Sequence, residues 1–189
     1  METQAEYKIT KKTIPRLLQP KTEYIVEYPQ AIAFTKLQNS VIWFSEEFKL
    51  EKDIQDIKVN MTEAESHGVL EVLKLFTQYE LSVGNEYWGD KVGKMFKRPE
   101  IQRMASCFSF FELNIHAPFY NKINELLMIN TPEFYNSYKK DKTLAARMKF
   151  IDECLEDDDP LFSLGTFAMV EGAVLYTSFA FLKHFQTNR

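Results

Sequence analysis

The chain has 189 residues, of which 45% are hydrophobic and 26% are charged, a composition typical of globular proteins rather than disordered or fibrous ones. Six glycines and seven prolines are few for a turn-rich β-sandwich, and two cysteines can form neither a disulfide framework nor a cysteine-only zinc site, so a reducing, cytoplasmic location is expected. The net charge of −4 leaves no positive surplus for binding nucleic acid or an anionic membrane.

The first 40 residues are predicted to form an N-terminal arm and the start of the first helix. Three prolines interrupt this segment, which shows no sustained helical or strand periodicity: Pro15, Pro20 and Pro29. A short helix is expected over residues 30–47, where apolar residues recur three to four positions apart. Residues 41–189 are then expected to form a bundle of helices.

Start signals predict the long helices that follow. Thr62 and Glu65 fit a capping box, in which the two side chains satisfy each other's free backbone N–H groups. The helix that begins there is expected to reach about Phe96, and the next one to run from about residue 100 to 128. Strand-like alternation is missing from the sequence, so the predicted fold class is all-α.

Two further start signals pair a capping side chain with a proline at the first helical position: Thr131-Pro132 and Asp159-Pro160. The last helix is expected to reach about residue 185. Within it, residues 165–182 carry a single charge and touch the lower length limit for a membrane-spanning helix. Because this run is the only one of its kind and has an ionisable residue in it, we interpret it as a buried core helix and expect no membrane insertion.

Three of the predicted long helices carry a carboxylate on a face that is otherwise apolar. On the first, Glu80 lies within a stripe of hydrophobic residues at helical spacing: Val69, Leu73, Phe76, Val83 and Tyr87. On the second, Glu112 and His116 are one turn apart, so their side chains can converge on one point. On the last, Glu171 shares a face with apolar residues. A buried carboxylate is costly unless it is paired or bound to a cation, so each of these needs a partner.

Pro118 lies inside the second of these helices, two residues after His116. Proline has no backbone N–H, so the hydrogen bond to the carbonyl of Asn114 cannot form. The helix is therefore expected to kink or bulge beside His116.

Two interpretations of these side chains are open on spacing alone. Each of them, taken singly, is more often a hydrogen-bonded core residue than a metal ligand. Arg and Lys partners are scarce in these helices, however, so three buried carboxylates would repel one another and take up protons unless a cation lay between them. Carboxylate and imidazole ligands on facing helices suit iron or manganese, which favours a metal site over a structural polar cluster.

Three segments carry a family resemblance: residues 75–83 (LFTQYELSV), 112–120 (ELNIHAPFY) and 170–179 (VEGAVLYTSF). In this order they resemble the small (beta) subunit of class I ribonucleotide reductase, and the resemblance extends over nearly the whole chain. It implies a ferritin-like helical bundle in which Glu80, Glu112, His116 and Glu171 bind metal, as part of a site for two iron ions or for manganese. It also implies a radical tyrosine at Tyr120, four residues after the histidine.

The resemblance further implies an oxidoreductase activity. Trp43, followed by two glutamates, resembles the tryptophan placed early in the family's long-range electron and proton route. Tyr120 would then store the oxidant, and Trp43 would relay it toward a large (alpha) subunit. Together the two subunits would make the deoxyribonucleotides needed for DNA replication.

Two features depart from the family pattern. The family usually places its glutamate three residues before the histidine, whereas Glu112 is four residues before His116, so either the helix is bulged there or Glu112 is not a ligand. The sequence also ends at Arg189, before the helix that contributes a second Glu-x-x-His pair. The chain is therefore predicted to be the N-terminal piece of a split small subunit, an incomplete bundle that a second polypeptide with the missing helix completes and that forms a homo-oligomer.

Three alternatives accompany this interpretation. The chain could be a truncated or degenerate product without activity. It could be another ferritin-like di-metal carboxylate protein, an oxidase or an iron store. It could also be a non-catalytic helical assembly module, in which the buried glutamates and the histidine are only structural.

Overall fold

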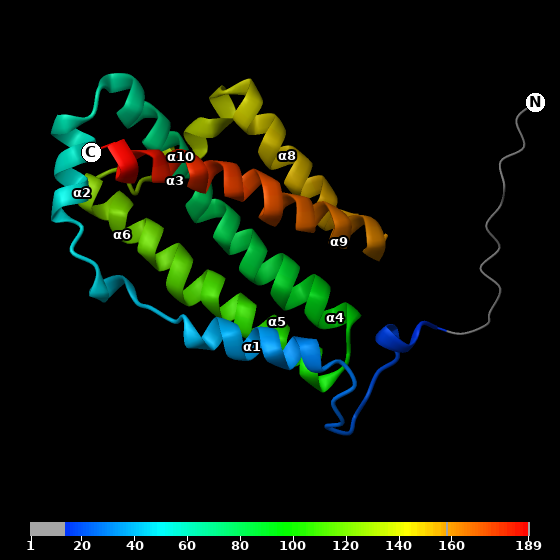
Figure 1. The fold of residues 1–189 in the computed structure, drawn as a ribbon. Coiled ribbons are helices and arrows are strands. Elements are labelled where there is room, and N and C mark those ends of the chain that lie inside the picture. The colour runs from blue at the N-terminus through cyan, green and yellow to red at the C-terminus, as the bar shows by residue number, and fades with distance from the viewer. Residues whose placement is uncertain (1–13, 158, 189) are drawn as a thin grey trace, which may run out of the picture.

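The computed structural model describes residues 14–157 and 159–188, and every regular element in these ranges is helical, as predicted (Figure 1). The α-helices are α1 Pro29–Ser40, α2 Glu51–Gln55, α3 Glu63–Ser82, α4 Gly93–Met95, α5 Pro99–Phe111, α6 Ala117–Leu127, α7 Pro132–Asn136, α8 Lys142–Glu156, α9 Pro160–Met169 and α10 Tyr176–Asn188. The π-helical segments are η3 Asp56–Asn60, η4 Val83–Val92, η5 Glu112–His116 and η7 Val170–Leu175, and the 3₁₀ turns are η1 Arg16–Leu18, η2 Ser45–Glu47 and η6 Ser137–Lys140. Residues 1–13 of the predicted arm lie outside the described ranges.

Side-chain caps determine where several helices begin. The Thr62 hydroxyl accepts a hydrogen bond from the backbone N–H of Glu65, and the Glu65 carboxylate accepts one from the N–H of Thr62 at 2.8 Å. This capping box confirms the predicted start of α3. Thr131 and Asp159 cap α7 and α9, each followed by proline, so those starts are confirmed as well.

The first helix is shorter than predicted. α1 ends at Ser40 rather than near residue 47, because Val41 leaves the helical region with φ −113° and ψ 20°. The backbone of Phe44 is extended, and its N–H donates to the Glu47 carboxylate at 2.7 Å, which closes η2. This local cap overrides the apolar spacing that predicted a longer helix.

Three long rods form the body of the molecule. The first rod is α3 continued through η4 into α4, the second is α5 continued through η5 into α6, and the third is α9 continued through η7 into α10. They lie side by side, with α1 along α5 and α8 beside the third rod (Figure 1). The predicted apolar stripe of the first rod is buried, as expected: Val69, Leu73, Phe76, Val83 and Tyr87.

The third rod is less buried than predicted. Leu161–Phe185 is a 25-residue helical stretch long and apolar enough to cross a membrane, with a mean hydropathy of 1.3 over a window of which 17% is buried. The prediction of a buried core helix is therefore wrong for the chain as described. One side packs against the first rod through residues such as Val170 and Leu175, but nothing among the described residues covers the other side, where Met169 is 64% and Tyr176 is 68% exposed.

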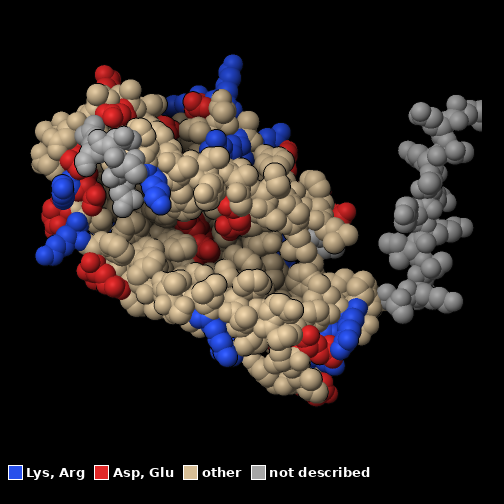
Figure 2. Space-filling view, in the orientation of Figure 1, with Lys and Arg blue, Asp and Glu red and all other residues tan. Residues whose placement is uncertain are grey.

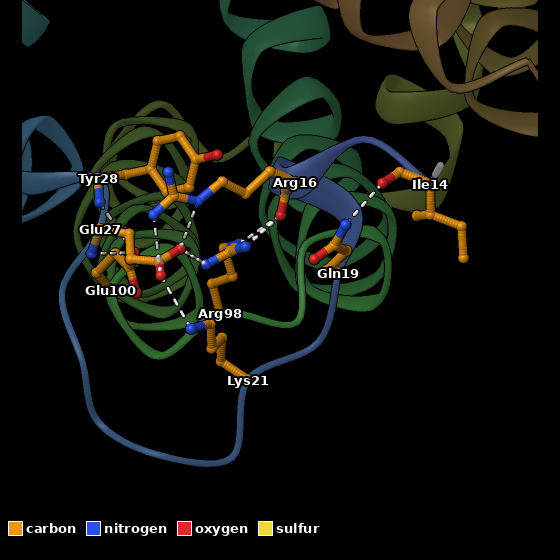
Figure 3. A network of polar contacts seen from close by, with 8 residues as sticks. All are labelled: Ile14, Arg16, Gln19, Lys21, Glu27, Tyr28, Arg98 and Glu100. Carbon is orange, nitrogen blue, oxygen red and sulfur yellow. Dashed lines mark hydrogen bonds and ion pairs between the residues drawn. The ribbon is translucent and has the colours of Figure 1, made fainter. Parts of the chain in front are cut away.

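A buried charge cluster fastens the segment before α1 to the corner where α5 begins (Figure 3). The Arg98 guanidinium is fully buried, donates to the carboxylate of Glu27 and to the carbonyl of Arg16, and lies over the ring of Tyr28. Glu100, also fully buried, accepts hydrogen bonds from the backbone N–H groups of Glu27 at 3.0 Å and of Tyr28 at 3.1 Å. These contacts fix the start of α1 against α5.

This cluster should make the attachment of residues 14–28 sensitive to acid. The Arg16 guanidinium, then the Lys21 ammonium, lower the pKa of Glu27 from 4.5 to about 2. A carboxyl whose pKa is lower in the folded chain stabilises it fully above 4.5, and the contribution is lost as the pH falls toward 2. We expect residues 14–28 to lose their protection from hydrogen exchange over this pH window. In Glu27→Gln, the protection of the same residues should be weak and should not change with pH. Identical profiles for the two proteins would contradict the assignment.

Candidate metal centre

Three of the predicted ligands meet between the first and second rods. One ligand atom from each of Glu80, Glu112 and His116 lies within 4.8 Å of the other two. Nδ1 of His116 is 2.7 Å from a carboxylate oxygen of Glu112 and 3.7 Å from one of Glu80. Glu80 is 3% and Glu112 is 8% exposed, whereas His116 is half-buried. Two buried carboxylates and an imidazole therefore converge on one point, from helices that are far apart in sequence.

The helix that carries Glu112 and His116 is bulged. Both residues belong to the π-helical segment η5, whose hydrogen bonds span five residues instead of four. The predicted disturbance beside Pro118 is thus present, just before α6. A π turn accommodates one more residue than an α turn, and this accounts for the four-residue spacing between the glutamate and the histidine. The helix is thus bulged between Glu112 and His116, as one of the two interpretations of that spacing requires.

The charges of the three side chains are coupled. Burial raises the pKa of Glu80, and the nearby Glu112 carboxylate raises it further. Burial acts the same way on Glu112, but hydrogen bonds from His116 and Glu80 outweigh it and lower the pKa of that carboxyl. For His116, burial lowers the pKa, but the bonds to Glu112 and Glu80 outweigh burial and raise it well above 6.5. The metal-free group therefore holds protons that a cation would displace.

Glu171 lies near this group but not within it. It stands in η7 of the third rod, and its side chain is exposed, so it is absent from the set whose ligand atoms lie within 4.8 Å. The surrounding protein nevertheless raises its pKa to about 7, and the negative charge of Glu112 contributes. Figure 2 shows a hollow between α9–α10 and the helices below it, with acidic side chains inside.

Tyr120 lies one turn beyond the group, at the start of α6. Its ring packs against Phe76 at 5.1 Å and against Phe119 at 5.8 Å between centroids. Burial strongly raises the pKa of its hydroxyl, and the charges of Glu80 and Glu112 raise it further. The phenol therefore keeps its proton at physiological pH and lies in an apolar pocket beside the carboxylates.

Trp43 contacts the group directly. Its ring is stacked on the imidazole of His116, with centroids 5.8 Å apart and planes 24° apart. Phe48 and Phe119 meet Trp43 edge-on, at 5.2 and 5.1 Å. The contact of Phe48 could not be predicted, because this residue lies in an irregular segment where no periodicity marks a contact.

The donor set fits a first-row metal. Carboxylate and imidazole donors suit iron and manganese, and the facing-helix arrangement is that of carboxylate-bridged two-metal bundles. Glu80, Glu112 and His116 would hold one ion, and Glu171 is near enough for the charge of Glu112 to act on its carboxyl. Tyr120, which follows His116 in the sequence, and Trp43, which precedes it, both lie beside these residues. The group can thus bind a cation and exchange protons next to two oxidisable rings.

Comparisons with known proteins show which family the chain belongs to. The family described as "Ribonucleotide reductase, small chain" matches residues 22–189, well over half of the chain. Among solved structures, the chain is similar to "Ribonucleotide reductase R2 subunit from Clostridium botulinum", with a TM-score of 0.70 and 23% identity, over 82% of this chain and 51% of that one. The chain thus spans about half the length of that subunit, and a comparison with curated proteins finds no match. The chain belongs to the ribonucleotide reductase small-chain family, and its helices form part of the ferritin-like R2 fold.

Proposed function

We propose that this chain houses part of the metal centre and the radical tyrosine of a ribonucleotide reductase small subunit. The observation that carries the proposal is the convergence of Glu80, Glu112 and His116 beside Tyr120. Glu171, on the third rod, would complete the ligands that this chain provides. Two iron ions, or manganese, would supply the oxidising power when bound.

Tyr120 would store the oxidant. Because burial and nearby carboxylates keep its hydroxyl protonated, loss of an electron from the ring has to be accompanied by loss of the hydroxyl proton. The carboxylates at the centre are the nearest bases. The apolar packing of Phe76 and Phe119 would exclude water and soluble reductants from the ring.

Trp43 would connect the centre to the outside of the bundle. It is partly exposed and stacks on His116, so one of its faces meets the metal ligand while its edge remains near solvent. This is the position from which an oxidising equivalent could pass toward a large subunit that reduces ribonucleotides. Association with that subunit, formation of a homo-oligomer and a cytoplasmic location are predictions that belong to this proposal.

The ligands described here do not complete a two-metal centre. We propose that a further helix carrying a glutamate and a histidine covers the exposed apolar side of the third rod, where Met169 and Tyr176 face solvent. Such a helix would bury this side. That a second polypeptide provides the helix belongs to the same proposal.

The radical assignment can be tested in the assembly completed with that helix and the large subunit. Tyr120→Phe should keep its metal but lose the tyrosyl radical signal in electron paramagnetic resonance and the formation of deoxyribonucleotides. Tyr24→Phe is the matched control and should keep both, because Tyr24 is 64% exposed in the segment before α1. A radical signal that survives in Tyr120→Phe would refute the assignment.

Metal binding should release protons. The pKa of His116 is raised in the metal-free chain, and so is that of Glu80, while a bound cation requires both side chains deprotonated. We expect about two protons to be released per ion near pH 7, so that affinity rises steeply with pH. Calorimetry in buffers of different ionisation enthalpy measures this number. Release of no protons would contradict the proposed ligands.

One observation favours a non-catalytic helical module as the second candidate. The 2.7 Å contact between His116 and Glu112 satisfies both side chains without a metal. Metal content separates this candidate from the reductase. Another ferritin-like oxidase would also bind metal, but it would form no deoxyribonucleotides with a large subunit.

A further inference from the structure

The first and second rods lie in close contact at a glycine one turn beyond Glu80. A Cβ atom placed on Gly84 would lie 2.7 Å from Cγ and 2.8 Å from Cδ2 of Leu113, and 3.0 Å from Cβ of Glu112. Real Cβ atoms essentially never approach other atoms below 3.0 Å. Leu113 Cγ and Glu112 Cβ are close to the backbone, so a side chain at position 84 would displace the segment η5 itself.

A hydrogen bond joins the rods at the same place. The hydroxyl of Ser109 donates to the carbonyl oxygen of Gly84 at 2.8 Å. Ser109 precedes Glu112 by about one turn of the second rod. The two rods are therefore held in contact by a polar link on one side of Gly84 and by direct packing of Leu113 on the other.

Glycine is costly in a helix, because it loses more backbone freedom on folding than any other residue. Gly165 and Gly172, on the third rod, have no atom within 4 Å of the Cβ that alanine would add. At Gly84, in contrast, the absence of a side chain has a steric reason. The atoms that a side chain there would meet include Cβ of Glu112, a member of the proposed ligand group.

We infer that Gly84 is a positioning residue for the metal centre: its missing side chain sets the distance between the helix of Glu80 and the helix of Glu112 and His116. Glu80 and Gly84 are four residues apart and share one side of the first rod. A larger residue at 84 would push η5 away, and Glu112 and His116 would move with it. The inference rests on the proposed function, because it concerns the geometry of the proposed ligands.

Gly84→Ala tests the inference together with a compensating change. Leu113→Ala removes the two closest atoms, so Gly84→Ala/Leu113→Ala should lose less stability than the two single variants together, measured by urea unfolding of the metal-free chain. Gly165→Ala is the control and should be at least as stable as the original chain, because the added Cβ meets no atom within 4 Å and the helical cost of glycine is removed. A double variant whose loss of stability equals the sum of the two single losses would overturn the packing argument.

Mn²⁺ affinity, measured from the free-ion signal in electron paramagnetic resonance, tests the positioning role. We expect Gly84→Ala to bind at least about tenfold more weakly, a loss in the range known for residues that orient ligands, and Gly165→Ala to bind unchanged. Compared with Gly84→Ala, the double variant should recover most of the lost stability but only part of the lost affinity for Mn²⁺, because the added Cβ still presses on Glu112. Unchanged affinity in a folded Gly84→Ala would overturn the inference.

The two measurements separate this inference from the proposed function. If the original chain binds no Mn²⁺, the proposed metal centre fails, and the role of Gly84 in positioning it fails with it. The stability cycle would still show whether Gly84 and Leu113 are coupled. If the original chain binds Mn²⁺ and Gly84→Ala binds equally well, the inference fails while the metal centre stands.

Discussion

Replacing His116 with alanine should weaken Mn²⁺ binding by more than about 100-fold, since loss of groups that only orient ligands already costs 10- to 100-fold. His116 is the only nitrogen donor in the group, and its Nδ1 lies 2.7 Å from Glu112 and 3.7 Å from Glu80. Without it, the two buried carboxylates would face each other and take up protons at neutral pH. The free Mn²⁺ signal in electron paramagnetic resonance would then stay unchanged when protein is added.

His67→Ala is the matched control. His67 is exposed near the start of α3, far along the first rod from Glu80, so its removal should leave the affinity for Mn²⁺ unchanged. Equal losses in the two variants would mean that histidines on the surface bind the ion. No loss in His116→Ala would remove His116 from the ligands.

Phe76→Ala should lower the free energy of unfolding by about 3–5 kcal/mol, the usual cost of emptying a buried phenylalanine site. Phe76 is 1% exposed and packs between Tyr120, at 5.1 Å, and Phe179, at 4.9 Å. The cavity left behind would also admit water next to the Tyr120 hydroxyl. In the completed assembly the tyrosyl radical should therefore decay faster, which electron paramagnetic resonance can follow.

The control for this change is another phenylalanine. Phe34 is 55% exposed on α1, and Phe34→Ala should change the free energy of unfolding by no more than about 0.5 kcal/mol. Urea unfolding of the two variants measures the difference. Equal effects of Phe34→Ala and Phe76→Ala would contradict the burial on which the protection of Tyr120 depends.

The helices were predictable where local chemistry fixes them. The Thr62 capping box and the Asp159 cap act within a few residues, so their sequence signals are sufficient, and α3 and α9 begin where predicted. The end of α1 was not predictable from apolar spacing. The hydrogen bond from the Phe44 N–H to the Glu47 carboxylate stabilises a turn where the helix would otherwise continue. Whether the turn is more stable than continued helix depends on how the following segment packs.

The candidate site was predictable in composition but not in geometry. Glu80 lies in one apolar stripe, and Glu112 and His116 lie in another. The stripes predicted that these side chains face inward, and the structure brings the three together. Pro118 predicted a disturbed helix but not specifically the π turn at η5, because a missing hydrogen bond permits either a kink or a bulge. The stacking of Trp43 on His116 joins an irregular segment to a helix, and no periodicity encodes it.

The third rod shows the limit of inference from hydropathy. An apolar run predicts that a helix is covered, but it does not say which element covers it. Among the described residues, the rod is covered on one side only, by the first rod and α8. The exposed side is where the proposed further helix would bind.

A crystal structure of the chain grown with Mn²⁺, with an anomalous difference map, tests the central claim most directly. We predict a peak bound by carboxylate oxygens of Glu80 and Glu112 and by an imidazole nitrogen of His116, at about 2.0–2.2 Å, the usual length for such ligands on a divalent ion of this series. A map with no peak there, and with His116 still donating to Glu112 alone, would contradict the account.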